Sequence, residues 1–240
     1  MVELLLITIL TIVASLVGTL TGFGSSTILV PLLLLVFPLP VTLLLAGILH
    51  WFNDIWKITL FRKGIKWKLI FSFGIPGVAL SYLGASLIFS APEELLSRVL
   101  GVFLAAYSIY LFADPKFKIS SSIPTAVTGG ALSGFFAGIF GLGGAIRSAF
   151  LAAFNLPKSV YLATAGAIAL VIDTTRVATY FAEGVRLDYM LLVGFIIFIP
   201  ASFYGAKIAQ LVVGKIPQKK FRLVIAVFLI LAGVKLIFLP

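Results

Sequence analysis

The chain has 240 residues, of which 61% are hydrophobic and only 11% are charged. Soluble domains carry about 25% charged residues, so this chain lacks the polar residues to cover a soluble core of its size. A transmembrane helix needs about 20 mostly apolar residues. From Leu4 to Asn53 there is no Asp, Glu, Lys or Arg, which is enough for two or more spans. The composition therefore predicts an integral membrane protein and argues against a soluble enzyme.

The formal net charge is +10 at pH 7. In a soluble protein this excess would favour nucleic-acid binding. Here the basic residues lie in short clusters between apolar segments, a pattern that orients a chain in a bilayer. We therefore expect the cytoplasmic membrane as the location, lipids as neighbours and no nucleic-acid partner. Since no Walker loop, zinc motif or nucleophile–base set is present, we also expect no cofactor, no metal and no enzymatic activity.

Hydropathy and helix breakers predict an all-α protein with ten helical segments. The first five cover 2–21, 25–37, 41–62, 67–89 and 93–112, and the second five cover 121–140, 144–155, 158–182, 187–210 and 217–238. The second and seventh segments have only about 12–13 residues, too few to cross a bilayer of about 30 Å comfortably. Each follows a glycine-rich break and ends at a proline, so both are predicted to be half-helices or arms of re-entrant hairpins.

An internal repeat relates the two halves, with 1–113 and 123–240 as the repeats and 114–122 as a cytoplasmic linker. At an offset of 119 residues, the first-half positions Gly22, Gly24, Leu32, Pro38, Val41, Ala46, Gly47 and Asp54 recur as Gly141, Gly143, Leu151, Pro157, Val160, Ala165, Gly166 and Asp173. Lys57 falls on Arg176 at the same offset. A chance match between apolar segments would not retain an acid and the basic residue three positions later.

The loop charges predict that the two repeats have opposite orientations in the membrane. The loop after the third segment is basic, whereas its counterpart near 183–188 is close to neutral. The next loop shows the reverse, with Glu93 and Glu94 in the first half and Lys219 and Lys220 in the second. Basic loops are cytoplasmic by the positive-inside rule. Inverted repeats with broken helices are typical of secondary transporters, whose site lies near the midplane at the repeat interface.

The glycine-rich breaks are candidate anion-binding positions. A helix N-terminus presents free backbone N–H groups and about half a positive charge, and glycine lets a substrate approach the backbone. The candidate substrate-binding residues are Gly24, Ser25, Ser26, Thr27, Gly143, Gly144, Arg147 and Ser148. The alternative is that the glycines only permit tight helix packing.

Arg147 lies just inside the seventh segment, and its repeat partner is Ile28, so the arginine breaks the symmetry of the halves. An intramembrane arginine is costly and by default suggests a functional site. Its guanidinium group matches oxyanions through paired hydrogen bonds. The alternative is a buried structural ion pair with Asp54 or Asp173.

The third and eighth segments hold a set of candidate gating or coupling residues, namely His50, Asn53, Asp54, Lys57, Asp173 and Arg176. An acid and a base three residues apart share a helix face and can pair. The simpler interpretation is an intrahelical ion pair that lowers the cost of both charges, and the alternative is a proton or gating switch. A lone histidine such as His50 is more often a hydrogen-bonded packing residue than a proton carrier.

At these motifs the sequence resembles the sulfite exporter TauE/SafE family of membrane permeases over nearly its whole length. The resemblance rests on two segments, GTLTGFGSSTILVPLLLLVFPLP and GIFGLGGAIRSAFLAAFNLPKSVYLATAGAIAL. It implies a permease of two homologous halves that moves sulfur-containing oxyanions, such as sulfite or organosulfonates, or related small anions. Members often carry Gly-Gly-Gly, an aliphatic stretch and a proline in both halves. Here the first half has Gly-Ser-Ser before Pro31, and the second has Gly-Gly-Ala, then Arg147 and no matching proline.

The sequence therefore predicts a secondary transporter that moves a small anion by alternating access. The alternatives are an anion channel, a membrane-embedded structural subunit, and a membrane enzyme for which only His50, Asp54 and Asp173 would be candidates. The direction of transport, the coupling ion and assembly into a homo-oligomer stay open.

Overall fold

The computed structural model describes residues 2–62, 64–113, 120–213 and 218–238, and the secondary structure within these residues is helical. The first half contains α1 (Val2–Thr21), α2 (Ser26–Leu33), α3 (Leu39–Leu60), α4 (Trp67–Leu87), the 3-10 turn η1 (Ile88–Ser90) and α5 (Glu93–Ala113). The second half contains α6 (Ile123–Phe140), α7 (Gly143–Ala152), α8 (Lys158–Ala182), α9 (Tyr189–Val212) and α10 (Gln218–Phe238). The all-α fold and its ten predicted segments are confirmed.

The two short helices are shorter than predicted. α2 has 8 residues and α7 has 10, which at 1.5 Å per residue gives lengths of about 12 and 15 Å. The predicted end of α2 at residue 37 is wrong, because the chain leaves the helix at Leu33 and turns. Apolar residues continue to Phe37, so hydropathy gave no sign of the end, while Pro38 disfavours helix in the residue before it.

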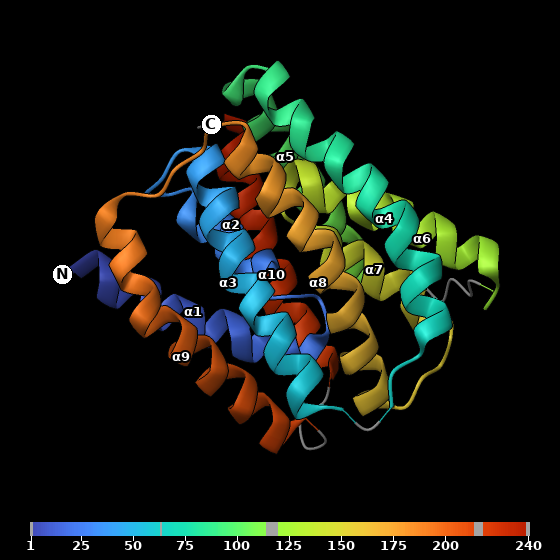
Figure 1. Ribbon diagram of the computed structural model, residues 1–240. Coiled ribbons are helices and arrows are strands. Elements are labelled where there is room, and N and C mark those ends of the chain that lie inside the picture. Colours follow the sequence, from blue (N-terminus) through green and yellow to red (C-terminus); the bar gives the residue numbers. More distant parts are fainter. Residues whose placement is uncertain (1, 63, 114–119, 214–217, 239–240) are drawn as a thin grey trace.

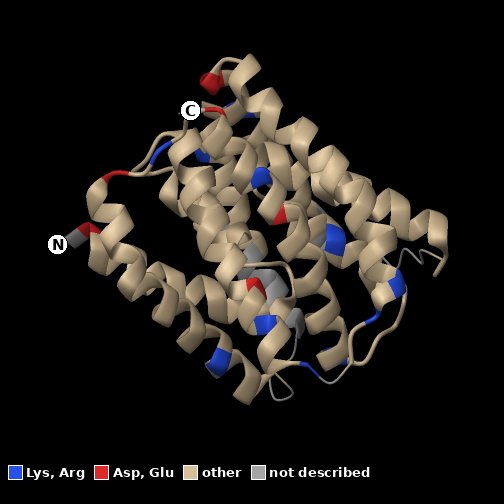
Figure 2. Cartoon of the chain, in the orientation of Figure 1, with Lys and Arg blue, Asp and Glu red and all other residues tan. Residues whose placement is uncertain are grey.

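Among the described residues, six helices are long and apolar enough to cross a membrane, namely α1, α3, α4, α6, α8 and α9. Large apolar side chains lie on their outer surfaces: Ile75 of α4 is 69% exposed and Ile196 of α9 is 75% exposed. Figure 2 shows that charged residues are sparse along these helices. Such outer surfaces are suited to lipid rather than to water.

Helices of the two halves are interleaved (Figure 1). α1 packs along α9 on one flank, α4 packs along α6 on the other, and α3 and α8 lie between them. α5 packs on α10. Under the predicted repeat, α4 corresponds to α9 and α6 corresponds to α1, so the pair α4–α6 corresponds to the pair α9–α1. The pairs α3–α8 and α5–α10 each consist of two corresponding helices. The bounds of the repeats and their opposite membrane orientations stay predictions.

Glycines bring the backbones of paired helices into contact. On α6 and α4, a Cβ atom added to the α6 glycines would overlap main-chain oxygens of α4, in the pairs Gly130–Phe73, Gly134–Gly77 and Gly138–Ser81. Gly205 of α9 meets the main-chain oxygen of Ile12 in α1 in the same way. Small residues of this kind allow membrane helices to pack closely.

The largest apolar core surrounds α2 and the start of α3. Leu29 and Leu33 of α2 and Leu39, Leu43 and Leu44 of α3 are at most 1% exposed. The second half of α3 continues this buried face but carries polar and charged side chains instead. The helix therefore leads directly from the apolar core to the candidate site.

Single cysteines can test the predicted inverted topology, because the chain has none of its own. We expect a cysteine at Lys68 or next to Lys219 to react from the cytoplasmic side, and one at Glu94 or Glu183 from the opposite side. Labelling by a membrane-impermeant maleimide in oriented vesicles measures this. If the cysteine at Glu94 and the cysteine next to Lys219 were labelled from the same side of the membrane, the inverted repeat would be contradicted. The predicted linker falls largely on 114–119, outside the described residues.

Candidate functional site

Polar side chains of both halves gather in the interior, where α2, α3, α7 and α8 meet. The buried members include His50, Asn53, Asp54, Lys57, Arg147, Asp173 and Arg176, each at most 3% exposed. Burying a charge is costly unless it is paired and hydrogen-bonded. The partners of each group therefore decide what this cluster can do.

Both acid–base pairs predicted from their spacing are present. Lys57 forms an ion pair with Oδ1 of Asp54 on α3. Arg176 Nε donates to Oδ1 of Asp173 on α8 at 2.7 Å. Arg176 also reaches the first half, since its Nη2 donates to Ser26 Oγ in α2 at 3.3 Å. Each pair largely neutralises itself, and the second one links the two halves.

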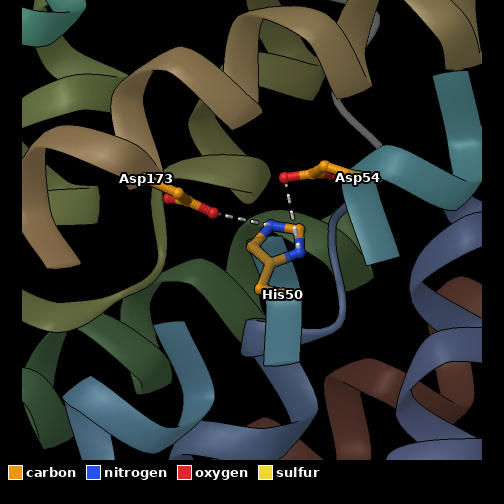
Figure 3. Close-up of side chains that lie close together, drawn as sticks. All are labelled: His50, Asp54 and Asp173. Atoms are coloured by element: carbon orange, nitrogen blue, oxygen red, sulfur yellow. Dashed lines mark ion pairs between the residues drawn. The ribbon is translucent and has the colours of Figure 1, made fainter. Parts of the chain in front are cut away.

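His50 lies between the two acids (Figure 3). Its Nδ1 is 3.8 Å from Asp54 Oδ2, and its Nε2 is 3.7 Å from Asp173 Oδ2. Neither Oδ2 atom has a hydrogen-bond partner. Ser25 Oγ of the first glycine-rich break lies 3.2 Å from Nδ1. The imidazole therefore joins α3, α8 and the break.

The ligand atoms of His50, Asp54 and Asp173 all lie within 4.8 Å of one another, which is close enough to consider a metal ion. One oxygen of each acid, however, already binds a basic side chain, Lys57 or Arg176. A metal ion here would lie near these two positive charges, and among the described residues no further acid belongs to this group. The donor set is therefore poorly suited to a metal.

Arg147 differs from the other buried cations. Its side chain is 1% exposed, and its Nε and Nη2 have no hydrogen-bond partner. The ion pairs of the described residues do not include it, so the alternative of a structural pair with Asp54 or Asp173 is absent from this geometry. Its helix, α7, packs against α8, which carries Asp173 and Arg176. Arg147 is thus a buried cation with free donors.

The other hydroxyl groups of the breaks bind the protein itself. Thr27 Oγ1 donates to the main-chain oxygen of Phe23 at 3.0 Å. Ser148 Oγ lies 2.8 Å from the main-chain oxygen of Gly22 and 2.7 Å from that of Gly144. Ser148 therefore ties α7 to the first break. A role of Ser148 or Thr27 in substrate binding stays a prediction.

The glycines of the breaks make close contacts. Gly24 has φ of +87°, which other residues rarely adopt, and a Cβ added there would lie 2.6 Å from His50 Nε2. A Cβ on Gly144 would overlap the main-chain oxygen of Phe23, and one on Gly143 would overlap that of Ser133. Tight packing, the alternative interpretation, accounts for these contacts. A role of the glycines in substrate approach stays a prediction.

Asn53, predicted as a gating or coupling residue, points toward α1 instead of the acids. Its Nδ2 donates to Ser15 Oγ and, at 3.3 Å, to Thr19 Oγ1. Ser15 Oγ in turn donates to the main-chain oxygen of Ser202 in α9 at 2.5 Å. The sequence-based predictions do not include this connection. The signal was present, because Thr11, Ser15 and Thr19 recur at every fourth residue of an otherwise apolar helix.

A cavity of about 420 Å³ lies away from the cluster, lined by residues from 65–72, 121–126 and 154–156. It shares no residue with the buried cluster. The charged side chains are instead enclosed by helices, so a ligand could reach them from water only after the helices move.

The family model described as sulfite exporter TauE/SafE matches residues 7–236 of this chain. A protein of Methanocaldococcus jannaschii, named as a probable membrane transporter protein, is 31% identical over 162 residues. That match covers 60% of this chain and 60% of the archaeal protein. The family match includes both breaks and all of the charged residues of the cluster.

Proposed function

Because the chain belongs to the sulfite exporter TauE/SafE family, we propose that it is a secondary transporter of a small anion in the cytoplasmic membrane. The substrate class we propose is a sulfur-containing oxyanion, such as sulfite or an organosulfonate. The family match and the name of the archaeal relative favour a membrane transporter over a membrane enzyme. The six long apolar helices agree with a multi-pass membrane protein.

The observation that carries the proposal is the pair of free nitrogens on Arg147. Nε and Nη2 are buried and lack hydrogen-bond partners. These two atoms form one edge of the planar guanidinium group, and their N–H bonds point in nearly parallel directions. That edge matches two oxygens of a sulfonate, sulfite or carboxylate group. A bound oxyanion would supply both missing hydrogen bonds and the missing counter-charge.

The charge balance of the cluster also favours an anion. Lys57, Arg147 and Arg176 face only two acids, Asp54 and Asp173. With neutral His50, the cluster therefore has one positive charge in excess. Arg147 lies in the second turn of α7, where the N-terminal end of the helix adds further positive potential. A monovalent anion would offset this excess.

The enclosure of the cluster favours a carrier over a channel. A channel needs a continuous path to its ion-binding positions, whereas a carrier exposes a central site to one side at a time. Arg147 is 1% exposed and lies among helices of both halves. Alternating access is the mechanism we propose for reaching it.

Purified protein in liposomes tests the function. We expect uptake of labelled sulfite or methanesulfonate that saturates with concentration. We also expect unlabelled substrate inside the vesicles to accelerate uptake, because a carrier returns faster when loaded. Empty liposomes and an equal concentration of a cationic solute serve as controls. A large conductance without this acceleration would indicate an anion channel, and flux equal to that of empty liposomes for a panel of small oxyanions would refute transport.

A further inference from the structure

His50 lies between two buried acids that belong to different halves of the chain (Figure 3). Asp54 and Asp173 each bind a basic side chain through Oδ1, and each has an Oδ2 without a hydrogen-bond partner. These two oxygens lie 3.8 and 3.7 Å from the two nitrogens of the same imidazole ring. All three side chains are 3% exposed or less. Two unpartnered, buried oxygens thus face one ring.

A neutral imidazole has one N–H and can donate to only one of these acids, whereas an imidazolium donates from both nitrogens. We propose that His50, with Asp54 and Asp173, is a proton-binding site that couples proton movement to anion movement. At Nδ1 the proton would be shared with Ser25 Oγ, 3.2 Å away. The inference rests on the proposed function, because it requires an anion at Arg147.

The charges around His50 explain why the proton and the anion would bind together. They come from α3, α8 and α7 and comprise Asp54, Lys57, Asp173, Arg176 and Arg147, while Ser25, just before α2, contributes a hydroxyl group. With a neutral imidazole this group has one positive charge in excess, and protonation alone would raise the excess to two. An anion on Arg147 lowers the excess by one, so it favours the imidazolium.

Thermodynamic linkage makes this effect reciprocal. If the bound anion raises the affinity of His50 for a proton by some factor, the bound proton raises the affinity for the anion by the same factor. A monovalent anion and one proton then cross the membrane together without net charge. The proton and the anion therefore move in the same direction, the proton on the imidazole of His50 and the anion on the guanidinium group of Arg147.

A nuclear magnetic resonance measurement tests the proton site directly, because His50 is the single histidine of the chain. The protein is labelled with ¹⁵N-histidine, purified without a polyhistidine tag and placed in lipid nanodiscs. At a fixed, mildly acidic pH, we expect saturating methanesulfonate to raise the ratio of imidazolium to imidazole about tenfold at constant ionic strength. Methanesulfonate keeps its single negative charge at working pH, so its own titration does not contribute.

A flux measurement tests the coupling. With a pH-sensitive dye inside liposomes, we expect an inward methanesulfonate gradient to acidify the interior. His50→Gln, which keeps a polar side chain without an ionisable group, should lower the number of protons moved per methanesulfonate about tenfold. Trp51→Phe is the matched control, since Trp51 lies next to His50 on α3 and the change removes its hydrogen bond to Thr174 but keeps an aromatic ring. The control should retain wild-type coupling.

The outcomes separate this inference from the proposed function. If methanesulfonate raises the unfolding temperature but leaves the His50 signal unchanged, the anion binds and the coupling is refuted. Wild-type proton flux per methanesulfonate in His50→Gln refutes it as well. If no oxyanion changes the unfolding temperature or crosses the membrane, the proposed function fails, and the coupling fails with it. A change in the His50 signal caused by Zn²⁺ would instead assign the three residues to a metal. The resonance measurement uses the unmodified chain, so it decides even where His50→Gln does not fold.

Discussion

Replacing Arg147 by alanine should remove most anion binding while leaving the protein folded. The substitution takes away two charge-assisted hydrogen bonds and the excess positive charge. We expect a loss of about 2–4 kcal/mol in binding free energy, which corresponds to a rise in Kd of roughly 30- to 700-fold. Without ligand, the variant should be as stable as the wild type or more stable, because a buried charge without a partner has been removed.

The measurement is thermal unfolding in a titration with methanesulfonate or sulfite. Arg147→Lys should give intermediate affinity, since lysine keeps the charge but not the planar pair of donors. Trp51→Phe again serves as a control of unchanged affinity. Wild-type affinity in Arg147→Ala would exclude Arg147 from the site. A variant that unfolds, and that regains stability when Asp173→Asn is added, would show that Arg147 is a structural partner of the acid.

Replacing Asp54 or Asp173 by alanine should have the largest effect on stability. Each change leaves a buried cation, Lys57 or Arg176, without its acid. Breaking a buried pair by removing one partner costs about 3–5 kcal/mol. Denaturant or thermal unfolding in one detergent measures the difference from the wild type.

The chain offers two matched comparisons for this prediction. Glu94 and Arg98 form a similar pair on α5, but their side chains are 65% and 53% exposed, so Glu94→Ala should cost about 1 kcal/mol or less. The double variant Asp54→Ala with Lys57→Met removes both charges and should regain most of the stability lost by Asp54→Ala. If Asp54→Ala proved no more destabilising than Glu94→Ala, the buried pair would not be a structural requirement.

The helices and the acid–base pairs could be predicted because both depend on local sequence. Apolar length and glycine-rich breaks place ten helices, and a spacing of three residues places Lys57 beside Asp54 and Arg176 beside Asp173. Arg147 stood out because its repeat partner is apolar. Its lack of hydrogen-bond partners could not be predicted, since that depends on how α7 packs against the other helices.

The convergence of Asp54 and Asp173 on His50 could not be predicted either. The predicted repeat makes the two acids equivalent, but they are 119 positions apart in the sequence. Equivalence in sequence does not say whether two residues lie close together in the fold. The packing of α3 on α8 places that contact in space. The hydrogen bond from the hydroxyl group of Tyr180 on α8 to the main-chain oxygen of Gly138 on α6 could not be predicted for the same reason.

The backbone contacts between paired helices have a mechanical consequence. Where Gly134 meets Gly77, and where Gly205 meets Ile12, no side chain separates the two backbones, so these helices cannot slide past each other without a clash. In a carrier that rocks between two states, α4 with α6 and α1 with α9 would therefore each move as one rigid body. Each body takes one helix from each half of the sequence. Cutting the chain between its halves would divide both bodies rather than separate one from the other.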